Sequence, residues 1–336
     1  MPSFNRVYAA AAAGLAKAEL EVFNAAVLGG RVTGIASTDI GGVPYITFDC
    51  ADLSDHDAAL LANLSSIYAL FAVEGETLRP VPLRRLDRYD DDLITILKYP
   101  GKTNEQFTKL LLNVTLLSSR YAAEMLTRRF TVLDPLCGRG TTLNQAIMYG
   151  FDARGIDTDK RDIEAYAAFI QRWLKDKRLK HQASYVPVRR ERQVIAHRLQ
   201  ASFAAAKEDY RAGDVQQLDV VCADTTRLLE FFRADSVDIM VADAPYGVQH
   251  GSQTADRGRA RSPLELLSQA APTWVKALRQ GGALGISWNT NVARRDAAAQ
   301  VLTDAGLLVA NDGPYLEFRH RVDQAIIRDI LIARKP

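Results

Sequence analysis

Short apolar runs alternate with longer segments of helical hydrophobic spacing through the last two thirds of the 336-residue chain. The apolar runs predict buried strands, and the segments between them predict helices, the first at 105–117. Such alternation predicts an α/β fold in which helices cover both faces of a parallel sheet. An antiparallel final pair, 310–318 and 325–333, is expected to close the sheet. The expected parallel strands are 131–134, one that ends at 155–159, 218–224, 237–242 and 281–288.

Residues 1–94 have a different pattern and predict a small α+β domain, separate from a second domain at 95–336. The expected order is a helix, two strands around a glycine turn, and a second helix with Ser54 as its N-cap. A βαβ-type, ferredoxin-like unit fits this order. Charged residues directly follow the alanine-rich start, which therefore predicts a helix of this domain and not a signal peptide. The expected elements are helix 9–23, strands 32–36 and 44–48, and helix 54–73.

The composition is that of an ordinary globular protein, with 48% hydrophobic residues, 24% charged residues and a net charge of +2. Because the chain is not polycationic overall, any nucleic acid must be bound by a local basic patch. No apolar run approaches the roughly 18 residues that a membrane span needs. The cysteines have neither disulfide nor metal-binding spacing, which predicts a cytoplasmic protein without a metal site. They are Cys50, Cys137 and Cys222.

Residues 165–215 contain the most basic tract of the chain, and we expect them to form a long helical insertion. A local tract of this kind can bind the phosphates of a nucleic acid. It can equally be a solvated surface, and the sequence leaves both interpretations open. Its cations are Lys175, Lys177, Arg178, Lys180, Arg189, Arg190, Arg192, Arg198 and Arg211.

A glycine loop follows the first strand of the α/β region, where Asp134 precedes Cys137, Gly138, Gly140, Thr141 and Thr142. Glycines at a strand-to-helix turn let the backbone approach a ligand closely. The loop lacks the Gly-Lys-Ser/Thr ending of a phosphate loop and the third glycine of the dinucleotide fingerprint. An acid before the loop would repel a pyrophosphate and attract an ammonium or sulfonium group. These features favour S-adenosylmethionine as the cofactor.

Polar residues at the other strand ends extend this predicted pocket. Asp157 and Asp159 follow the second strand at the distance where an acid binds ribose hydroxyls. Asp224 ends the next strand and can accept a hydrogen bond from the adenine amino group, although a surface acid is the alternative. Thr103 and Asn104 can donate to the cofactor carboxylate, and Asn104 can equally cap the helix that follows.

The apolar strand 237–242 leads into Asp243, Ala244, Pro245 and Tyr246. Open α/β sheets bind their ligands at such carboxyl ends of strands. A planar amino group could donate hydrogen bonds to the Asp243 carboxylate and the Ala244 carbonyl while its ring stacks on Tyr246. A strand followed by an ordinary proline turn is the structural alternative.

These stretches resemble two motifs of methyltransferases that modify amino groups of nucleic acids. Residues 134–141 resemble their Asp-Pro-Phe-Cys-Gly-x-Gly-Thr motif, and residues 243–246 resemble their (Asn/Asp/Ser)-Pro-Pro-Tyr motif. Gly247 and the tract 99–102 bring the chain closest to RNA guanine-N2 methyltransferases of the tRNA type. The resemblance covers about 98–333. It departs at Ala244, where the family usually has proline, and this difference frees one backbone dihedral angle of that turn.

The resemblance implies a Rossmann-like class I methyltransferase that transfers a methyl group from S-adenosylmethionine to an exocyclic nucleobase amine. Guanine N2 in tRNA or rRNA is the leading target. DNA adenine-N6 or cytosine-N4 methylation, methylation of a small molecule or protein amide, and RNA binding without catalysis are the alternatives. The resemblance also implies that residues 1–94 recognise the substrate, with a structural appendage as the other interpretation. The arginine-bearing loop 247–262 is expected to order over the target base.

Overall fold

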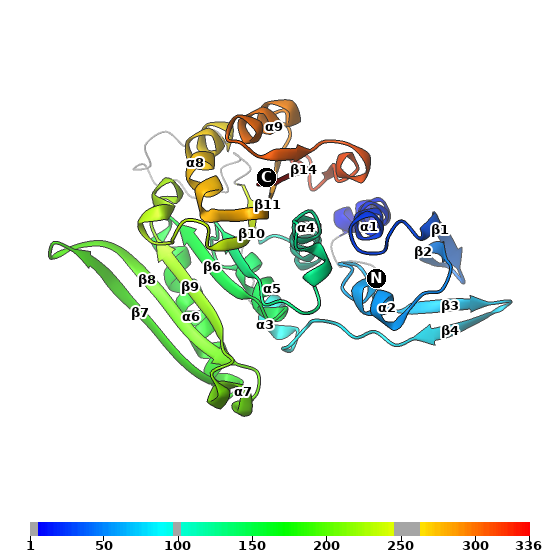
Figure 1. Ribbon diagram of the computed structural model, residues 1–336, viewed down its shortest axis with the longest axis horizontal. Coiled ribbons are helices and arrows are strands. Elements are labelled where there is room, and N and C mark those ends of the chain that lie inside the picture. The colour runs from blue at the N-terminus through cyan, green and yellow to red at the C-terminus, as the bar shows by residue number, and fades with distance from the viewer. Residues whose placement is uncertain (1–5, 97–101, 245–262) are drawn as a thin grey trace.

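The computed structural model describes residues 6–96, 102–244 and 263–336 of the chain. One large mixed sheet dominates it, with helices on both faces and two small hairpins at the N-terminal end (Figure 1). The strand order of the large sheet is β12-β14-β11-β10-β5-β6-β9-β8-β7, and β13 pairs with β14. The predicted α/β class, with a Rossmann-like sheet, is confirmed.

Five strands of the large sheet are parallel, and each predicted strand among them is present. These are β5 (Thr131–Asp134), β6 (Asp152–Asp157), β9 (Gln216–Cys222), β10 (Val237–Asp243) and β11 (Leu278–Asn289). β10 could be recognised from its apolar residues because the strand is buried on both faces. Its Ile239 and Val241 belong to one hydrophobic cluster, and Met240 and Ala242 belong to the cluster on the opposite face.

The closing strands differ in part from the prediction. β14 (Ile327–Arg334) is present near the predicted 325–333 and is antiparallel both to β11 and to the short strand β12, its expected partner. The segment 310–318 is not a strand, since β12 covers only Leu308–Ala310 and the 3-10 helix η3 occupies Gly313–Leu316. A glycine with φ +50° followed by Pro314 interrupts the extended backbone there. The two-residue β13 (His320–Arg321) then pairs with β14.

The predicted helical insertion at 165–215 is wrong. Helix α6 (Lys160–Asp176) ends early, and an antiparallel hairpin of β7 (Lys180–Arg190) and β8 (Gln193–Ala204) follows, with α7 at Lys207–Ala212. β8 pairs with β9, so the hairpin widens the sheet at one edge. Exposed and half-buried residues alternate along β7, which is the period of a strand with one solvated face. Its many charges hid that period.

The N-terminal segment also differs from the expected βαβ unit. It contains α1 (Arg6–Ala26), β1 (Val32–Ile40), β2 (Val43–Cys50), α2 (Asp55–Leu61), β3 (Leu70–Glu74) and β4 (Thr77–Val81). The strands form two separate antiparallel hairpins, which excludes a ferredoxin-like sheet among the described residues. The second helix stops at Leu61, far short of residue 73, although Ser54 and Asp57 form the predicted capping box.

A buried polar network joins this segment to the sheet-covering helix α4 (Glu105–Leu117). Glu19 of α1 is fully buried and accepts from the Ser65 N–H and hydroxyl groups and from Asn113 Nδ2 at 2.8 Å. Tyr149 donates to Asn113 Oδ1 at 2.9 Å. Burial raises the pKa of Glu19, which these hydrogen bonds oppose. The division of the chain at residue 94 stays a prediction, but α1 and α4 contribute to one hydrophobic cluster.

The remaining helices pack in two groups. α4, α5 (Thr141–Met148) and the short α3 (Asp92–Thr95) pack together, with α1 against α4, whereas α8 (Pro263–Ala277) and α9 (Arg295–Asp304) pack against each other. Two further 3-10 turns, η1 (Ala122–Glu124) and η2 (Thr225–Glu230), complete the elements. Within the described ranges, no helix combines the length and the apolar character that a membrane crossing requires.

Candidate cofactor and active site

The acids predicted from sequence converge at one edge of the sheet. β5, β6, β9 and β10 are parallel, so their carboxyl ends lie along the same edge, where Asp134, Asp157 and Asp243 stand at strand ends. Chain order reverses at β5, which lies between β10 and β6. A reversal of this kind opens the crevice in which doubly wound α/β proteins bind ligands.

The glycine loop after β5 is a tight turn that positions its backbone against this crevice. Gly140 has φ +79°, and its N–H donates to the Cys137 carbonyl at 2.7 Å. A Cβ at Gly140 would lie 2.4 Å from the Tyr166 ring, so only glycine fits there. Gly138 has φ +46°, and a Cβ there would meet open space. The loop is therefore closed toward Tyr166 and open at Gly138, and α5 begins at Thr141.

Asp134 is a buried carboxyl group at the base of the loop. Its Oδ1 accepts from the Leu136 N–H at 2.9 Å, and Thr142 also hydrogen bonds to it. Burial raises the pKa of Asp134 to about 7, against the effect of these hydrogen bonds, and the nearby Asp157 and Asp243 raise it further. Because burial and the neighbouring acids disfavour the charged form of Asp134, a cation that binds beside it would stabilise the carboxylate.

Asp157 ties the end of β6 to the glycine loop. Its Oδ2 accepts from the Gly138 N–H at 2.9 Å, and its Oδ1 accepts from the Asp159 N–H at 2.9 Å. Burial raises its pKa, and the same backbone hydrogen bonds lower it. Asp159 is the N-cap of α6 and accepts from the Arg161 N–H. The carboxylate of Asp157 thus lies beside the loop where the sequence predicts the cofactor ribose.

Two of the other predicted cofactor residues act as helix caps. Asn104 Oδ1 accepts from the N–H groups of Gln106 and Phe107, so the capping alternative for Asn104 is confirmed. Asp224 accepts from the Thr226 N–H at 2.8 Å and from the Thr226 hydroxyl at 2.6 Å, which caps η2. Its contact with adenine stays a prediction.

Cys137 is a structural residue of the loop. Its N–H donates to the Ile156 carbonyl at 3.2 Å, and its side chain is 4% exposed. Burial raises the pKa of the Cys137 thiol well above its usual range. A thiol in this state is a poor nucleophile, since the thiolate is the reactive form.

Asp243 is held in a cluster of polar groups from distant parts of the chain. The hydroxyl of Thr103, just before α4, donates to Asp243 Oδ2, and the hydroxyl of Ser287 in β11 donates to Asp243 Oδ1. Arg328 Nη2 of β14 lies 3.8 Å from Oδ2. The Ala244 N–H donates to the Ser287 carbonyl at 2.8 Å. Both carboxylate oxygens are therefore fixed in place.

Sequence reasoning missed Ser287, Arg328 and their neighbours. The Arg328 side chain is 5% exposed, and its guanidinium lies 4.2 Å from the centre of the Phe107 ring. His320 packs on the same ring, and its Nδ1 lies 2.9 Å from the Phe318 carbonyl, which it can donate to in the neutral state. Burial lowers the pKa of His320 to about 4, so it is neutral at pH 7. No local pattern in the sequence points to Ser287, because it becomes the direct neighbour of Asp243 only through the register of β10 and β11.

Several predicted residues lie outside the described residues. These are Pro245, Tyr246 and Gly247, the arginine-bearing loop up to residue 262, and the tract 97–101 before Lys102.

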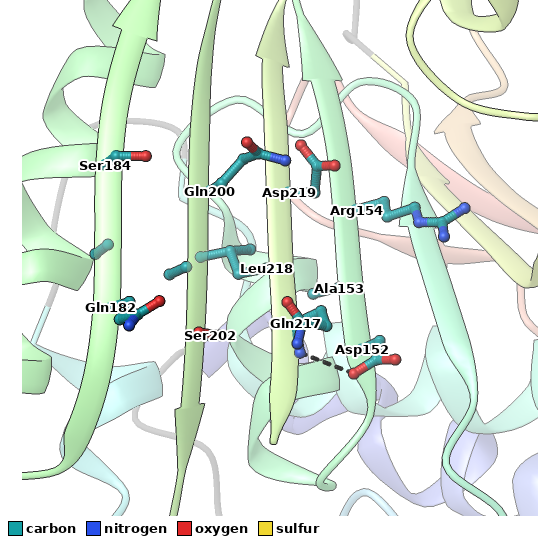
Figure 2. A pocket seen from close by; sticks show the side chains of 12 residues that line it. Asp152, Ala153, Arg154, Gln182, Ser184, Gln200, Ser202, Gln217, Leu218 and Asp219 are labelled. Carbon is teal, nitrogen blue, oxygen red and sulfur yellow. Dashed lines mark hydrogen bonds between the residues drawn. The ribbon is translucent and has the colours of Figure 1, made fainter. Parts of the chain in front are cut away.

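A pocket of about 570 Å³ lies on the large sheet over β6, β9, β8 and β7 (Figure 2). Side chains of four neighbouring strands line it, among them Gln182 of β7, Gln200 of β8, Asp219 of β9 and Arg154 of β6. None of the predicted cofactor or catalytic residues is among its lining. The carboxyl edge of the sheet, with its buried acids and open loop, is the better candidate for chemistry.

The strand order, the glycine loop and the acidic carboxyl edge together define a Rossmann-like methyltransferase. The chain belongs to the family described as the RMKL-like methyltransferase domain, whose model matches residues 117–299. This membership confirms the resemblance to RNA methyltransferases, and S-adenosylmethionine is the cofactor.

Solved structures that resemble this chain do so at low identity. TrmN from Thermus thermophilus is 16% identical over 78% of this chain and 55% of its own, with a TM-score of 0.40. The PH0226 protein from Pyrococcus horikoshii OT3 is 13% identical over 74% and 97%, with a TM-score of 0.39. An rRNA methylase from Streptococcus thermophilus is 11% identical over 70% and 99%, with a TM-score of 0.36. No curated protein matches the chain.

Proposed function

We propose that this protein transfers a methyl group from S-adenosylmethionine to an exocyclic amino group of a nucleobase in RNA, with guanine N2 in tRNA or rRNA as the target. The observation that carries the proposal is the fixed carboxylate of Asp243. Its oxygens are oriented by the Thr103 and Ser287 hydroxyls at the carboxyl edge that also holds Asp134 and Asp157. The motifs at 134–141 and 243–246 support the same chemistry.

The residues at this edge have the chemistry that the cofactor requires. Asp134 is a buried acid whose raised pKa would fall on contact with a sulfonium or ammonium group. Gly138 leaves open space where a larger residue would place a side chain, and Asp157 beside it suits ribose hydroxyls. Asp224 at the end of β9 is proposed to accept from the adenine amino group. When bound, the cofactor supplies an electrophilic methyl group.

The chain's own residues must make a poor nucleophile reactive. An exocyclic amine delocalises its lone pair into the ring, so alignment toward the methyl group is the main contribution available. Asp243 accepts one N–H of the amine, and the Ala244 carbonyl accepts the other, which directs the lone pair. The new N–C bond forms as the bond from methyl to sulfur breaks, and the amine then loses a proton that Asp243 can accept. Arg328 Nη2 lies 3.8 Å from the same carboxylate and, with the two hydroxyls, helps to hold it in position.

The target base must leave its stack to reach this edge. Tyr246 is proposed to stack on it, and base–aromatic stacking contributes roughly 1–3 kcal/mol. The N-terminal segment 1–94 is proposed as a substrate-recognition part, which adds contacts away from the reacting amine.

The decisive experiment supplies radiolabelled S-adenosylmethionine and either unmodified tRNA, rRNA or DNA to the purified protein, followed by nucleoside analysis of the product. Label in N2-methylguanosine is the expected result. Asp243→Asn keeps the shape of the side chain and should bind the cofactor with near wild-type affinity while losing most of its turnover. Label in methyladenine or methylcytosine of DNA, or full activity of the Asn variant, would overturn the proposal.

A further inference from the structure

The tip of the β7–β8 hairpin reaches beyond the edge of the sheet at which the proposed chemistry occurs. β9 ends at Cys222, which pairs with His197 of β8, so residues 193–196 of β8 have no ladder partner in β9. They pair only with β7, whose chain turns at residues 190–193. Four residues of strand extend the hairpin by roughly 13 Å past the end of β9. Figure 1 shows the hairpin as the outermost part of the sheet.

The distance to Asp243 follows from the strand order. β8 is four strands away from β10 in the sheet, which is a lateral separation of about 19 Å. Combined with the overhang, the tip is on the order of 20 Å from the Asp243 carboxylate. A polynucleotide that presents one base at Asp243 can therefore pass the hairpin tip with its flanking backbone.

The tip is strongly basic and solvent-exposed. Arg189, Arg190, Glu191 and Arg192 are all exposed, and together they carry a net charge of +2. Arg190 is paired with Glu230 of η2 at 3.3 Å, which anchors the hairpin to the body of the protein. Within the ranges that the structure describes, Arg189 and Arg192 make no ion pair. By contrast, Lys177 and Arg198 of the same basic tract are neutralised by Asp92 and Asp219.

The backbone of the turn is strained at two residues, and other residue types would avoid this strain. Glu191 has φ +50° and Arg192 has φ +67°, in a two-residue connection between paired Arg190 and Gln193. Asn-Gly or Gly-Gly satisfies such a turn without strain, whereas other L residues are disfavoured there. Strain that a cheaper residue would remove is a mark of a functional position. At Arg192, that function would be carried by the long, charged side chain.

We propose that the tip of the β7–β8 hairpin, residues 189–193, is an arm that binds the phosphate backbone of the RNA substrate through Arg189 and Arg192. The inference rests on the proposed function, because RNA is the polyanion that the active edge would serve. Figure 1 shows this hairpin and the N-terminal segment at opposite ends of the molecule, so the arm adds a contact surface far from that segment.

The first test measures binding of an unmodified, transcribed tRNA by fluorescence anisotropy at several salt concentrations. Each lost phosphate contact lowers the slope of log K against log salt by about 0.7–0.9. The Arg189→Gln, Arg192→Gln double variant should therefore bind roughly 10- to 30-fold more weakly at 0.15 M salt, with a slope smaller by about 1.5. Cofactor affinity should be unchanged, because neither Arg189 nor Arg192 is among the residues proposed to bind the cofactor.

The matched control removes two exposed charges far from the tip, through Lys180→Gln at the start of β7 and Lys207→Gln at the start of α7. It should bind the tRNA as the wild type does. Equal losses of tRNA affinity in the two double variants, or no loss in the tip variant, would overturn the proposed arm. Neither result would contradict the proposal that the protein methylates RNA. If the wild-type protein binds no RNA at any salt concentration, the arm and the proposed substrate both fail.

A second variant separates stability from binding. Arg192→Gly relieves the positive φ and should raise the melting temperature while it weakens tRNA binding by about 4- to 6-fold at 0.15 M salt. Glu191→Asn relieves the neighbouring position and removes an acid, so it should raise the melting temperature without weakening binding. Retained tRNA affinity in the glycine variant would refute a role for the Arg192 side chain.

Discussion

The raised pKa of Asp134 predicts that cofactor binding depends on pH near neutrality. The perturbation is a change of pH from 8 to 6 at constant ionic strength. With a pKa of about 7, Asp134 is about 90% ionised at pH 8 and about 10% ionised at pH 6. A sulfonium cation favours the ionised carboxylate, so the apparent Kd should rise in inverse proportion to that fraction. The affinity for S-adenosylmethionine should fall roughly tenfold over this interval.

The sign of this effect is fixed by the direction of the shift. As the pH falls, a proton competes with the sulfonium group for the Asp134 carboxylate. The affinity for S-adenosylmethionine therefore rises with pH through about 7 and levels off above 8. His320, with a pKa of about 4, stays neutral across the same interval and contributes no slope. Isothermal titration calorimetry in buffers of different ionisation enthalpy would also detect the proton released on binding.

The control is Asp134→Asn, which should bind more weakly at pH 8 and show little dependence on pH between 6 and 8. S-adenosylhomocysteine lacks the sulfonium charge and should show a smaller slope on the wild-type protein. A flat wild-type profile, or affinity that falls as the pH rises, would show that Asp134 does not face the cationic part of the cofactor.

Three further outcomes follow from the geometry. Ser287→Ala removes a hydroxyl that donates to the Asp243 carboxylate, and a hydrogen bond to a charged group is worth about 1.5–3 kcal/mol, so kcat should fall roughly 10- to 100-fold; Ser268→Ala, on the exposed face of α8, should leave it unchanged. Gly140→Ala should lower the melting temperature far more than Gly306→Ala does, because both have positive φ but only the former meets the Tyr166 ring. Asn104→Ala should lower stability by about 1 kcal/mol in denaturant titration through loss of a helix cap, and an unchanged midpoint would contradict that role.

The sheet was predictable where its strands are buried on both faces. In β10 every residue from Val237 to Ala242 is buried and all but Asp238 are apolar, so the sequence shows a strong apolar run. The β7–β8 hairpin was not predictable in the same way. One of its faces is solvated and carries Gln182, Ser184 and Gln200, and its turn lacks the glycine that marks a hairpin.

The site was predictable to the extent that its residues directly follow strands. Asp134, Asp157 and Asp243 were found because the carboxyl ends of parallel strands meet at one edge. Ser287 and Arg328 were not, because they become neighbours of Asp243 only through the lateral register of β10, β11 and β14. Register between strands far apart in sequence leaves no local pattern.

Helix α4 connects the buried network of the N-terminal segment with the Asp243 cluster. Near its C-terminal half, Asn113 is tied to the buried Glu19 of the N-terminal segment. At its N-terminus, Asn104 caps the helix directly after Thr103, which contacts Asp243. Asn113 follows Asn104 by nine positions, which is a rise of about 13.5 Å along the helix. In the proposed function, α4 would therefore keep an RNA bound at the N-terminal segment at a fixed distance from the Asp243 carboxylate.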